Sequence, residues 1–205
     1  MVDTLSISHM AYPVTALGPG NRIALWVAGC PMRCMDCITP HLQDKNNGKV
    51  VAVDKLLQRI LSLDKRILGS INGITFTGGE PFSQAEYLAE LWQGLKQAFP
   101  NWNLLVFSGY QLSALQQKQE YSALLAKVDI LIDGPYLPEL AKGIKDPLIA
   151  STNQNTHLLT ERGHALSNGL NKQKEVNLGM GNQHNWLIGI VDKRQRLNYH
   201  QLINA

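Results

Sequence analysis

Apolar residues gather in four short runs along the first two thirds of the chain, and polar segments separate these runs. Each run is nearly continuous in apolar or β-branched side chains, a pattern typical of strands that are buried on both faces. The four predicted strands span residues 22–28, 73–77, 103–107 and 128–132. Each is followed by glycine or a short polar residue, which predicts a turn.

Between these runs, apolar residues recur every three or four positions, which predicts amphipathic helices. The first predicted helix begins at Asp54, a suitable N-cap residue, and stops at Gly69. The second begins at Ser83–Glu86, where the spacing is that of a capping box, and it ends before Pro100. A weaker, glutamine-rich helix is predicted over residues 112–126.

Strands that alternate with helices at about 30 residues per unit predict a parallel sheet with right-handed crossovers. A complete eightfold barrel needs about 250 residues, and this chain has 205. The predicted fold class is therefore α/β, a partial, open (β/α) TIM-like barrel. Residues 1–162 are predicted to form the core and 163–205 a C-terminal extension packed on it. Within the extension we expect a loop or flap over 163–185, a strand over 186–191 and a helix over 192–203.

Composition and charge narrow the class of protein. Hydrophobic residues make up 44% of the chain, enough to bury a core and to exclude a disordered chain. The net charge is only +3, and we interpret the basic cluster Lys193–Arg196 as a solvated helix start, so we expect no nucleic-acid partner. No apolar stretch approaches the roughly 20 residues that span a bilayer, and the N-terminus lacks the features of a secretory signal. We therefore expect a cytoplasmic protein without a membrane partner.

The three cysteines of the chain lie within eight residues, in the pattern C-x3-C-x2-C formed by Cys30, Cys34 and Cys37. An odd, crowded set is a poor disulfide framework and favours a metal site. Three thiolates on one loop suit an iron–sulfur cluster whose fourth iron is left open to another ligand. The alternative is a structural zinc ion held by the three cysteines and His41, which follows at a workable spacing.

Polar or ligating groups follow each of the four predicted strands. They are Cys30, Gly78–Glu80, Ser108–Gly109 and Asp133–Gly134. The carboxyl ends of parallel strands share one edge of a sheet, where α/β folds bind ligands, so we expect these groups to converge. Paired glycines allow close approach of the backbone to a ligand, and Glu80 is placed to meet an ammonium group. Taken alone, Thr77–Pro81 is equally compatible with a plain strand-to-helix turn.

At this point the sequence resembles the radical S-adenosylmethionine superfamily, whose hallmarks are the C-x3-C-x2-C loop and a GGEP stretch after the second strand. Within the superfamily it is most similar to small activating enzymes of the anaerobic ribonucleotide reductase and pyruvate formate-lyase type. The further matching segments are Gly18–Arg22, Gly29–Pro31, Phe107–Tyr110, Asp129–Gly134 and Ser151–Gln154. The resemblance covers about residues 9 to 160.

The resemblance implies an oxidoreductase in which Cys30, Cys34 and Cys37 ligate a [4Fe–4S] cluster and S-adenosyl-L-methionine chelates its free iron. It implies that Gly78, Gly79 and Glu80 hold the amino group of this co-substrate, and that Ser108 and Asp133 contact its ribose or methionyl end. Reductive cleavage would give a 5′-deoxyadenosyl radical, which abstracts hydrogen from a backbone glycine. The implied partners are a glycyl radical enzyme as protein substrate and flavodoxin or a similar reductant.

Two features depart from the pattern of these relatives. Asp36 stands where many of them carry an aromatic residue that packs near adenine, and an aspartate cannot stack. The chain also continues about 40 residues past the point where the smallest activases end. Two other functions stay open: a radical enzyme for a small molecule or peptide, similar to 7-carboxy-7-deazaguanine synthase but disfavoured by Ile38–Thr39, and a non-enzymatic zinc module.

Overall fold

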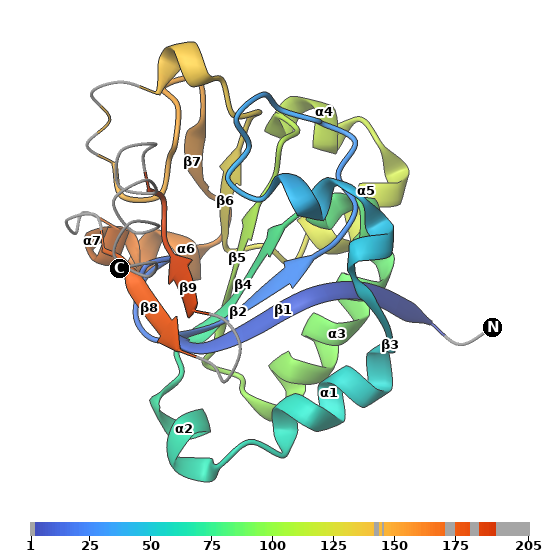
Figure 1. Cartoon of the computed structure of the whole chain (residues 1–205). Coiled ribbons are helices and arrows are strands. Elements are labelled where there is room, and N and C mark those ends of the chain that lie inside the picture. Colours follow the sequence, from blue (N-terminus) through green and yellow to red (C-terminus); the bar gives the residue numbers. More distant parts are fainter. Residues whose placement is uncertain (1–2, 142–143, 145, 171–174, 181–184, 192–205) are drawn as a thin grey trace.

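The computed structural model describes residues 3–141, 144, 146–170, 175–180 and 185–191. A seven-stranded sheet forms its centre, and a two-stranded hairpin lies beside it (Figure 1). The strands are β1 (Thr4–Val14), β2 (Arg22–Val27), β3 (Lys49–Ala52), β4 (Gly73–Gly78), β5 (Asn103–Phe107), β6 (Ile130–Asp133), β7 (Asn155–Leu158), β8 (Asn177–Met180) and β9 (Asn185–Ile188). The α-helices are α1 (Val53–Leu61), α2 (Lys65–Ser70), α3 (Ala85–Ala98), α4 (Leu112–Gln116), α5 (Gln119–Leu125), α6 (Glu161–Ala165) and α7 (Ser167–Leu170). Short 3₁₀ turns are η1 (Pro40–Gln43), η2 (Lys45–Asn47), η3 (Pro81–Gln84) and η4 (Pro138–Leu140).

The strand order of the large sheet is β3-β1-β2-β4-β5-β6-β7. Its centre, β2-β4-β5-β6, is parallel and consists of the four strands that the apolar runs predict. The outer strands β1, β3 and β7 are antiparallel to their neighbours, and β1 and β3 are absent from the sequence prediction. The open, largely parallel sheet confirms the predicted partial barrel.

One face of the sheet is covered by α1, α3, α4 and α5, and the other by α6, α7 and the β8–β9 hairpin (Figure 1). The main core lies between the sheet and the first group of helices. Its fully buried members include Phe76, Phe82, Leu88, Leu91 and Leu95. Burial of each such side chain stabilises the fold by about 1.5–3 kcal/mol.

The predicted start of the first helix is wrong. The N-cap of α1 is Ala52, because β3 leads directly into α1. The Val53 amide donates to Asp3 O (3.0 Å), which continues the pairing of β3 with β1. Asp54 lies in the first turn and accepts from the adjacent Lys55 amide. Strand pairing therefore decides where this helix begins.

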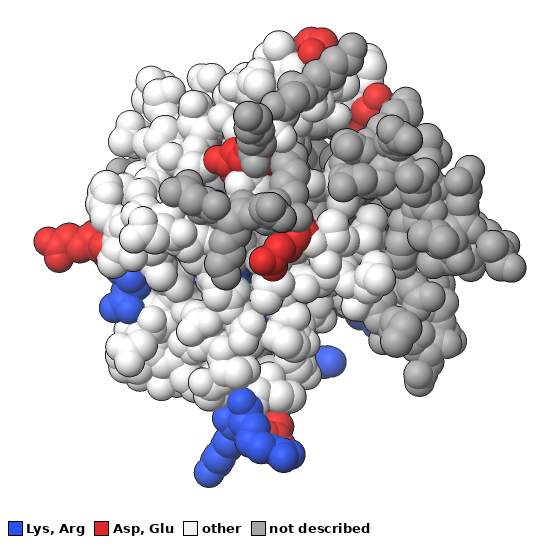
Figure 2. Space-filling model, turned by 90° about the vertical axis from the view of Figure 1, so that its left-hand side faces the viewer, with Lys and Arg blue, Asp and Glu red and all other residues white. Residues whose placement is uncertain are grey.

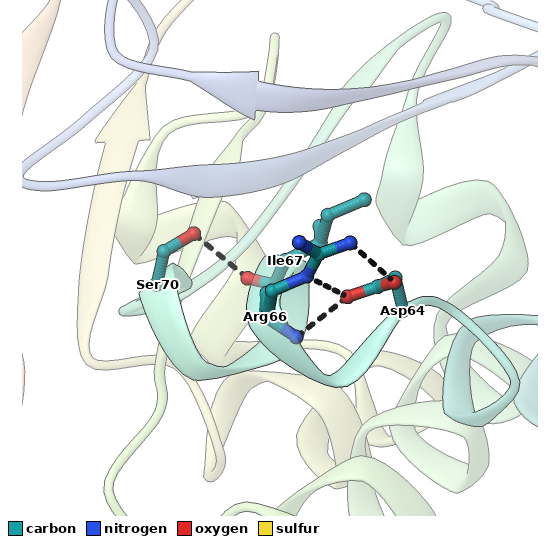
Figure 3. Close-up of polar contacts among 4 residues, drawn as sticks. All are labelled: Asp64, Arg66, Ile67 and Ser70. Carbon is teal, nitrogen blue, oxygen red and sulfur yellow. Dashed lines mark hydrogen bonds and ion pairs between the residues drawn. The ribbon is translucent and has the colours of Figure 1, made fainter.

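The same helix is also shorter than predicted, because it ends at Leu61 and α2 begins after Asp64. The Asp64 carboxylate accepts from the Arg66 amide (2.8 Å) and from the Arg66 guanidinium, which keeps the pKa of this carboxyl below its usual range. At the other end of α2, Ser70 Oγ donates to Ile67 O (Figure 3). A second N-cap within the apolar periodicity thus splits one predicted helix into two. The predicted 112–126 helix is likewise divided, into α4 and α5.

The capping box predicted at Ser83–Glu86 does not form. Glu80 caps η3 instead, by accepting from the Phe82 amide, and η3 leads directly into α3. Gln84, the residue before α3, turns its side chain inward. Its amide bonds to the backbone of Ser6 and Ala28, which anchors β1 beneath the helix start.

The extension holds more regular structure than predicted. The expected loop over 163–185 contains most of α6, all of α7 and strand β8. The predicted strand at 186–191 corresponds to β9, which pairs with β8. The predicted helix over 192–203, with its basic cluster Lys193–Arg196, lies outside the described residues. The boundary at residue 162 stays a prediction.

The described surface on the side of the extension carries only scattered charged side chains (Figure 2). Across the described ranges, each helix falls short of the length and apolarity that a membrane crossing requires.

Candidate functional site

The groups predicted to converge do meet at the carboxyl edge of the parallel strands. The parallel pairing of β2 with β4 places Val27 beside Gly78, so the loops that follow these strands leave the sheet side by side. The Glu80 amide donates to Gly29 O (2.9 Å), which joins the two loops one residue before Cys30. Ser108, directly after β5, lies within hydrogen-bond distance of the Glu80 side chain. The structure therefore brings Cys30, Glu80 and Ser108 together.

The cysteine loop is held at its base and folds tightly. The amides of Gly29 and Cys30 donate to Leu42 O (2.8 Å) and Gln43 O (3.1 Å), so η1 anchors the start of the loop. Within the loop, Arg33 and Asp36 have φ angles of 48° and 55°. Left-handed backbone at non-glycine residues costs about 1–2 kcal/mol each, so this turn is held by its surroundings. Asp36 is exposed.

The three cysteines are partly buried and form no disulfide with one another. Burial raises the pKa of Cys30, and the nearby Glu80 carboxylate raises it further. Within the described residues, no three His, Cys, Asp or Glu side chains already converge as a metal-binding set. Three thiolates on one tight turn are the donor set that an iron–sulfur cluster takes, so the chemistry of the loop fits a cluster. The structure gives no support to a zinc site with His41 as the fourth ligand, since the His41 side chain is exposed on η1.

Glu80 lies at the centre of the site and is almost completely buried (1% exposed). Its Oε1 accepts from the Phe82 amide (2.9 Å) and from Ser108 Oγ (3.0 Å), and its Oε2 accepts from the Gly109 amide (2.7 Å). Burial raises the pKa of Glu80 to about 7, against these hydrogen bonds, which lower it. A carboxylate offers about four acceptor positions, and these three hydrogen bonds fill three of them.

The paired glycines serve a close approach between two parts of the chain. A Cβ on Gly79 would lie inside the contact distance of Gly29 O and 3.0 Å from Leu42 O, so only glycine lets the cysteine loop reach β4. Thr39 Oγ1 donates to Gly78 O (3.2 Å) and lies 3.9 Å from Cys37 Sγ. Both ends of the cysteine loop therefore return to the glycines.

Met32 is a site residue that the sequence analysis missed. A Cβ on Gly109 would lie 2.5 Å from Met32 Cγ and 3.1 Å from Met32 Sδ, so the Met32 side chain crosses over Gly109 beside Glu80. No pattern in the sequence predicts the contact of Met32 with Gly109. It fixes the cysteine loop against the residue whose amide holds Glu80.

Asp133 lies at the same edge, as the last residue of β6. It follows Leu131 by two residues on β6 and so shares the helix-covered face of the sheet. Asp133 Oδ2 accepts from the Leu112 amide at the start of α4 (2.6 Å) and lies 3.0 Å from His157 Nε2, and Oδ1 accepts from Asn155 Nδ2 (3.2 Å). These contacts join α4 and β7 to β6.

The chain is similar to one protein-family model and to several known activating proteins. A protein-family model described as a 4Fe-4S single cluster domain matches residues 16–157. The anaerobic ribonucleoside-triphosphate reductase-activating protein of Vibrio cholerae is 31% identical over 159 residues, which cover 74% of this chain and 97% of that protein. Its Haemophilus influenzae counterpart is 32% identical over 152 residues, or 71% and 94% of the two chains. The pyruvate formate-lyase-activating enzyme of Staphylococcus epidermidis is 29% identical over 203 residues, or 92% of this chain and 78% of that enzyme.

Proposed function

Because this chain belongs to the 4Fe-4S single cluster domain family, together with the anaerobic ribonucleoside-triphosphate reductase-activating proteins, we propose that it activates a glycyl radical enzyme. One observation carries the proposal: the C-x3-C-x2-C loop lies directly against Gly78–Glu80 at the carboxyl edge of the parallel strands. When bound, the cluster and S-adenosylmethionine supply reductive carbon–sulfur cleavage, whose product takes a hydrogen atom from a glycine of the partner.

The residues of this chain bind and orient these groups. Cys30, Cys34 and Cys37 would hold the cluster through their thiolates. The remaining acceptor position of Glu80 receives the ammonium group of the co-substrate, and this positive charge favours the ionised carboxylate. Gly78 and Gly79 keep the cysteine loop close enough for both contacts.

The direct contact of Ser108 and Asp133 with the ribose or methionyl end stays a prediction, and their observed contacts support positioning roles beside it. Ser108 Oγ donates to Glu80 and accepts from the Tyr110 amide (3.1 Å), which fixes the direction of the carboxylate. Asp133 accepts from the Leu112 amide and so orients the start of α4, which follows the loop that contains Ser108. A flavodoxin-like one-electron donor and a location in the cytoplasm stay predictions of the sequence.

The test is anaerobic activation of named partners. The chain is reconstituted with iron and sulfide, reduced with dithionite and mixed with S-adenosylmethionine. It is then presented with the anaerobic ribonucleoside-triphosphate reductase of V. cholerae, the pyruvate formate-lyase of S. epidermidis, or a glycyl radical enzyme encoded beside it. We expect a glycyl-radical doublet by electron paramagnetic resonance, together with 5′-deoxyadenosine.

A Cys34→Ala variant is the matched control and should lose both signals, because two thiolates cannot hold the cluster. Formation of 5′-deoxyadenosine without a radical on any partner would contradict the activase function and favour a small-molecule or peptide substrate. Tight binding of one zinc ion without labile sulfide would contradict the cluster itself.

A further inference from the structure

The Asp133 carboxylate contacts both β7 and the start of α4. Its side chain is only 4% exposed, so its oxygens need partners within the protein. Asp133 Oδ2 accepts from the Leu112 amide (2.6 Å) and lies 3.0 Å from His157 Nε2 on β7. Asp133 Oδ1 accepts from Asn155 Nδ2 (3.2 Å). The same oxygen, Oδ2, therefore meets the first residue of α4 and an imidazole ring.

Strand pairing places the His157 ring beside this carboxylate. His157 pairs with Leu131 in the antiparallel register of β6 and β7, so its side chain shares one face of the sheet with Leu131 and Asp133. In the part of the chain that the structure describes, no Lys or Arg side chain lies within ion-pair distance of Asp133. Among those residues, the imidazole is therefore the group that can give this buried carboxylate a positively charged partner.

Residues 108–112 lead from β5 into α4 and are called here the β5–α4 segment. Backbone hydrogen bonds with the end of β6 hold the first half of this segment, from the Ser108 amide (2.8 Å) and to Tyr110 O (3.2 Å). The second half depends on a side chain, because the Leu112 amide donates to the Asp133 carboxylate. The direction of that carboxylate therefore decides how the segment enters α4.

The β5–α4 segment also holds Glu80. Ser108 Oγ and the Gly109 amide donate to the two oxygens of the Glu80 carboxylate, at 3.0 and 2.7 Å. These are two of the three hydrogen bonds that Glu80 accepts, so the segment largely determines where this carboxylate points. A continuous chain of contacts thus runs from His157 through Asp133 and the β5–α4 segment to Glu80.

We propose that His157 is a positioning residue for the binding of S-adenosylmethionine. By fixing the Asp133 carboxylate, it keeps the β5–α4 segment, and with it Glu80, in the arrangement that receives the ammonium group. The proposal rests on the proposed function, which places that ammonium group on Glu80. A carboxylate that loses a partner is free to turn, and at metal sites the outer contacts that orient a binding group are worth about 10–100-fold in affinity.

The experiment measures the binding of S-adenosylmethionine to the reconstituted chain with its cluster oxidised. Cleavage requires an electron, so the oxidised chain binds the co-substrate without consuming it, and anaerobic isothermal titration gives Kd. His157→Leu keeps much of the side-chain volume and removes both nitrogens, whereas His157→Gln keeps a nitrogen donor at a similar reach. His164→Leu is the matched control, because His164 is exposed on α6.

We expect His157→Leu to raise Kd by about tenfold, because the carboxylate that fixes the β5–α4 segment loses a partner. With the cluster reduced and the co-substrate saturating, kcat for 5′-deoxyadenosine formation should stay within about twofold, since the change affects binding. His157→Gln should bring Kd back to within about threefold of the unchanged chain. His164→Leu should leave Kd unchanged. Iron content and thermal unfolding check that each variant is loaded and folded.

Two further measurements follow the chain of contacts itself. In a double-mutant cycle, His157→Leu should change Kd little once Asp133→Asn is present, because the ring acts through that carboxylate. In the cluster-free chain, amide hydrogen exchange over the β5–α4 segment should be faster in His157→Leu than in the unchanged chain, whereas exchange in β2 should be the same.

Three results would overturn the proposal while the activase function stands. They are an unchanged Kd in His157→Leu, additive effects of the two changes in the cycle, and a Kd in His157→Gln as high as in His157→Leu. The last would show that a retained donor does not keep the carboxylate in place. Failure of the unchanged chain to bind S-adenosylmethionine is a different result, because it removes the proposed function first.

Discussion

Replacing Gly79 by alanine should separate the cysteine loop from β4, because the position has no room for a Cβ. The added carbon would lie 2.9 Å from the carbonyl carbon of Gly29 and 3.0 Å from Leu42 O, and still closer to Gly29 O. All three are backbone atoms. No side chain can rotate away, so the loop itself must move.

The size of the effect follows from the contacts that such a movement strains. Two hydrogen bonds hold the loop here, from the Glu80 amide to Gly29 O (2.9 Å) and from the Gly29 amide to Leu42 O (2.8 Å). Overpacking costs about 1–3 kcal/mol, and each lost hydrogen bond adds about 1 kcal/mol. The free energy of unfolding should therefore fall by roughly 3–5 kcal/mol.

Urea titration of the cluster-free chain, followed by circular dichroism, measures this loss. Gly69→Ala is the matched control, because Gly69 lies in α2 with nothing within 4 Å of an added Cβ. That variant should gain about 0.5–1 kcal/mol, since alanine favours the helix. Reconstituted Gly79→Ala should also bind less iron per chain. A loss below about 1 kcal/mol in Gly79→Ala, with full iron binding, would refute the reasoning.

Three further predictions concern buried groups. The folded pKa of Glu80, about 7, lies above the ordinary value of 4.5, so the folded chain binds an extra proton between these values. The stability of the cluster-free chain should fall by roughly 3 kcal/mol as the pH rises from 4.5 to 7, and Glu80→Gln should abolish this slope in urea titrations at several pH values. Arg22 is fully buried and donates five hydrogen bonds, so Arg22→Lys should lower the free energy of unfolding by about 3–5 kcal/mol. In the control Arg66→Lys the side chain is exposed, so the thermal midpoint should change little. Gly109→Ala should destabilise the chain by about 1–3 kcal/mol through its clash with Met32, and a double-mutant cycle with Met32→Ala should recover most of that loss; an additive result would exclude the contact.

The sequence predicts the parallel centre of the sheet well and its antiparallel edge poorly. Strands β2, β4, β5 and β6 are buried on both faces, so their apolar runs stand out without reference to the rest of the fold. In β1 the register shifts between Ile7 and His9 and again between Ala11 and Val14, which breaks the period of two that a half-exposed strand shows. That strand is held by its partners and leaves little mark on the sequence.

The meeting of the strand ends at the candidate site could also be predicted from the sequence, whereas the contacts made by its loops could not. Cys30, Glu80 and Ser108 meet because the ends of parallel strands must share an edge, which topology alone requires. The direction of Asp133 and the contact of Met32 with Gly109 depend on how loops fold between those ends. Local spacing does not encode such contacts, which are decided by packing across distant segments.

Two hydrogen bonds of Asn177 join positions 162 residues apart, from Thr15 near one end of the chain to the hairpin near the other. A nascent chain leaves the ribosome from its N-terminus, so the parallel strands and the cysteine loop are available before the hairpin has been synthesised. The interior of the barrel is therefore open while the protein is being made and closes last. We expect delivery of iron and sulfide to have its widest access in that interval.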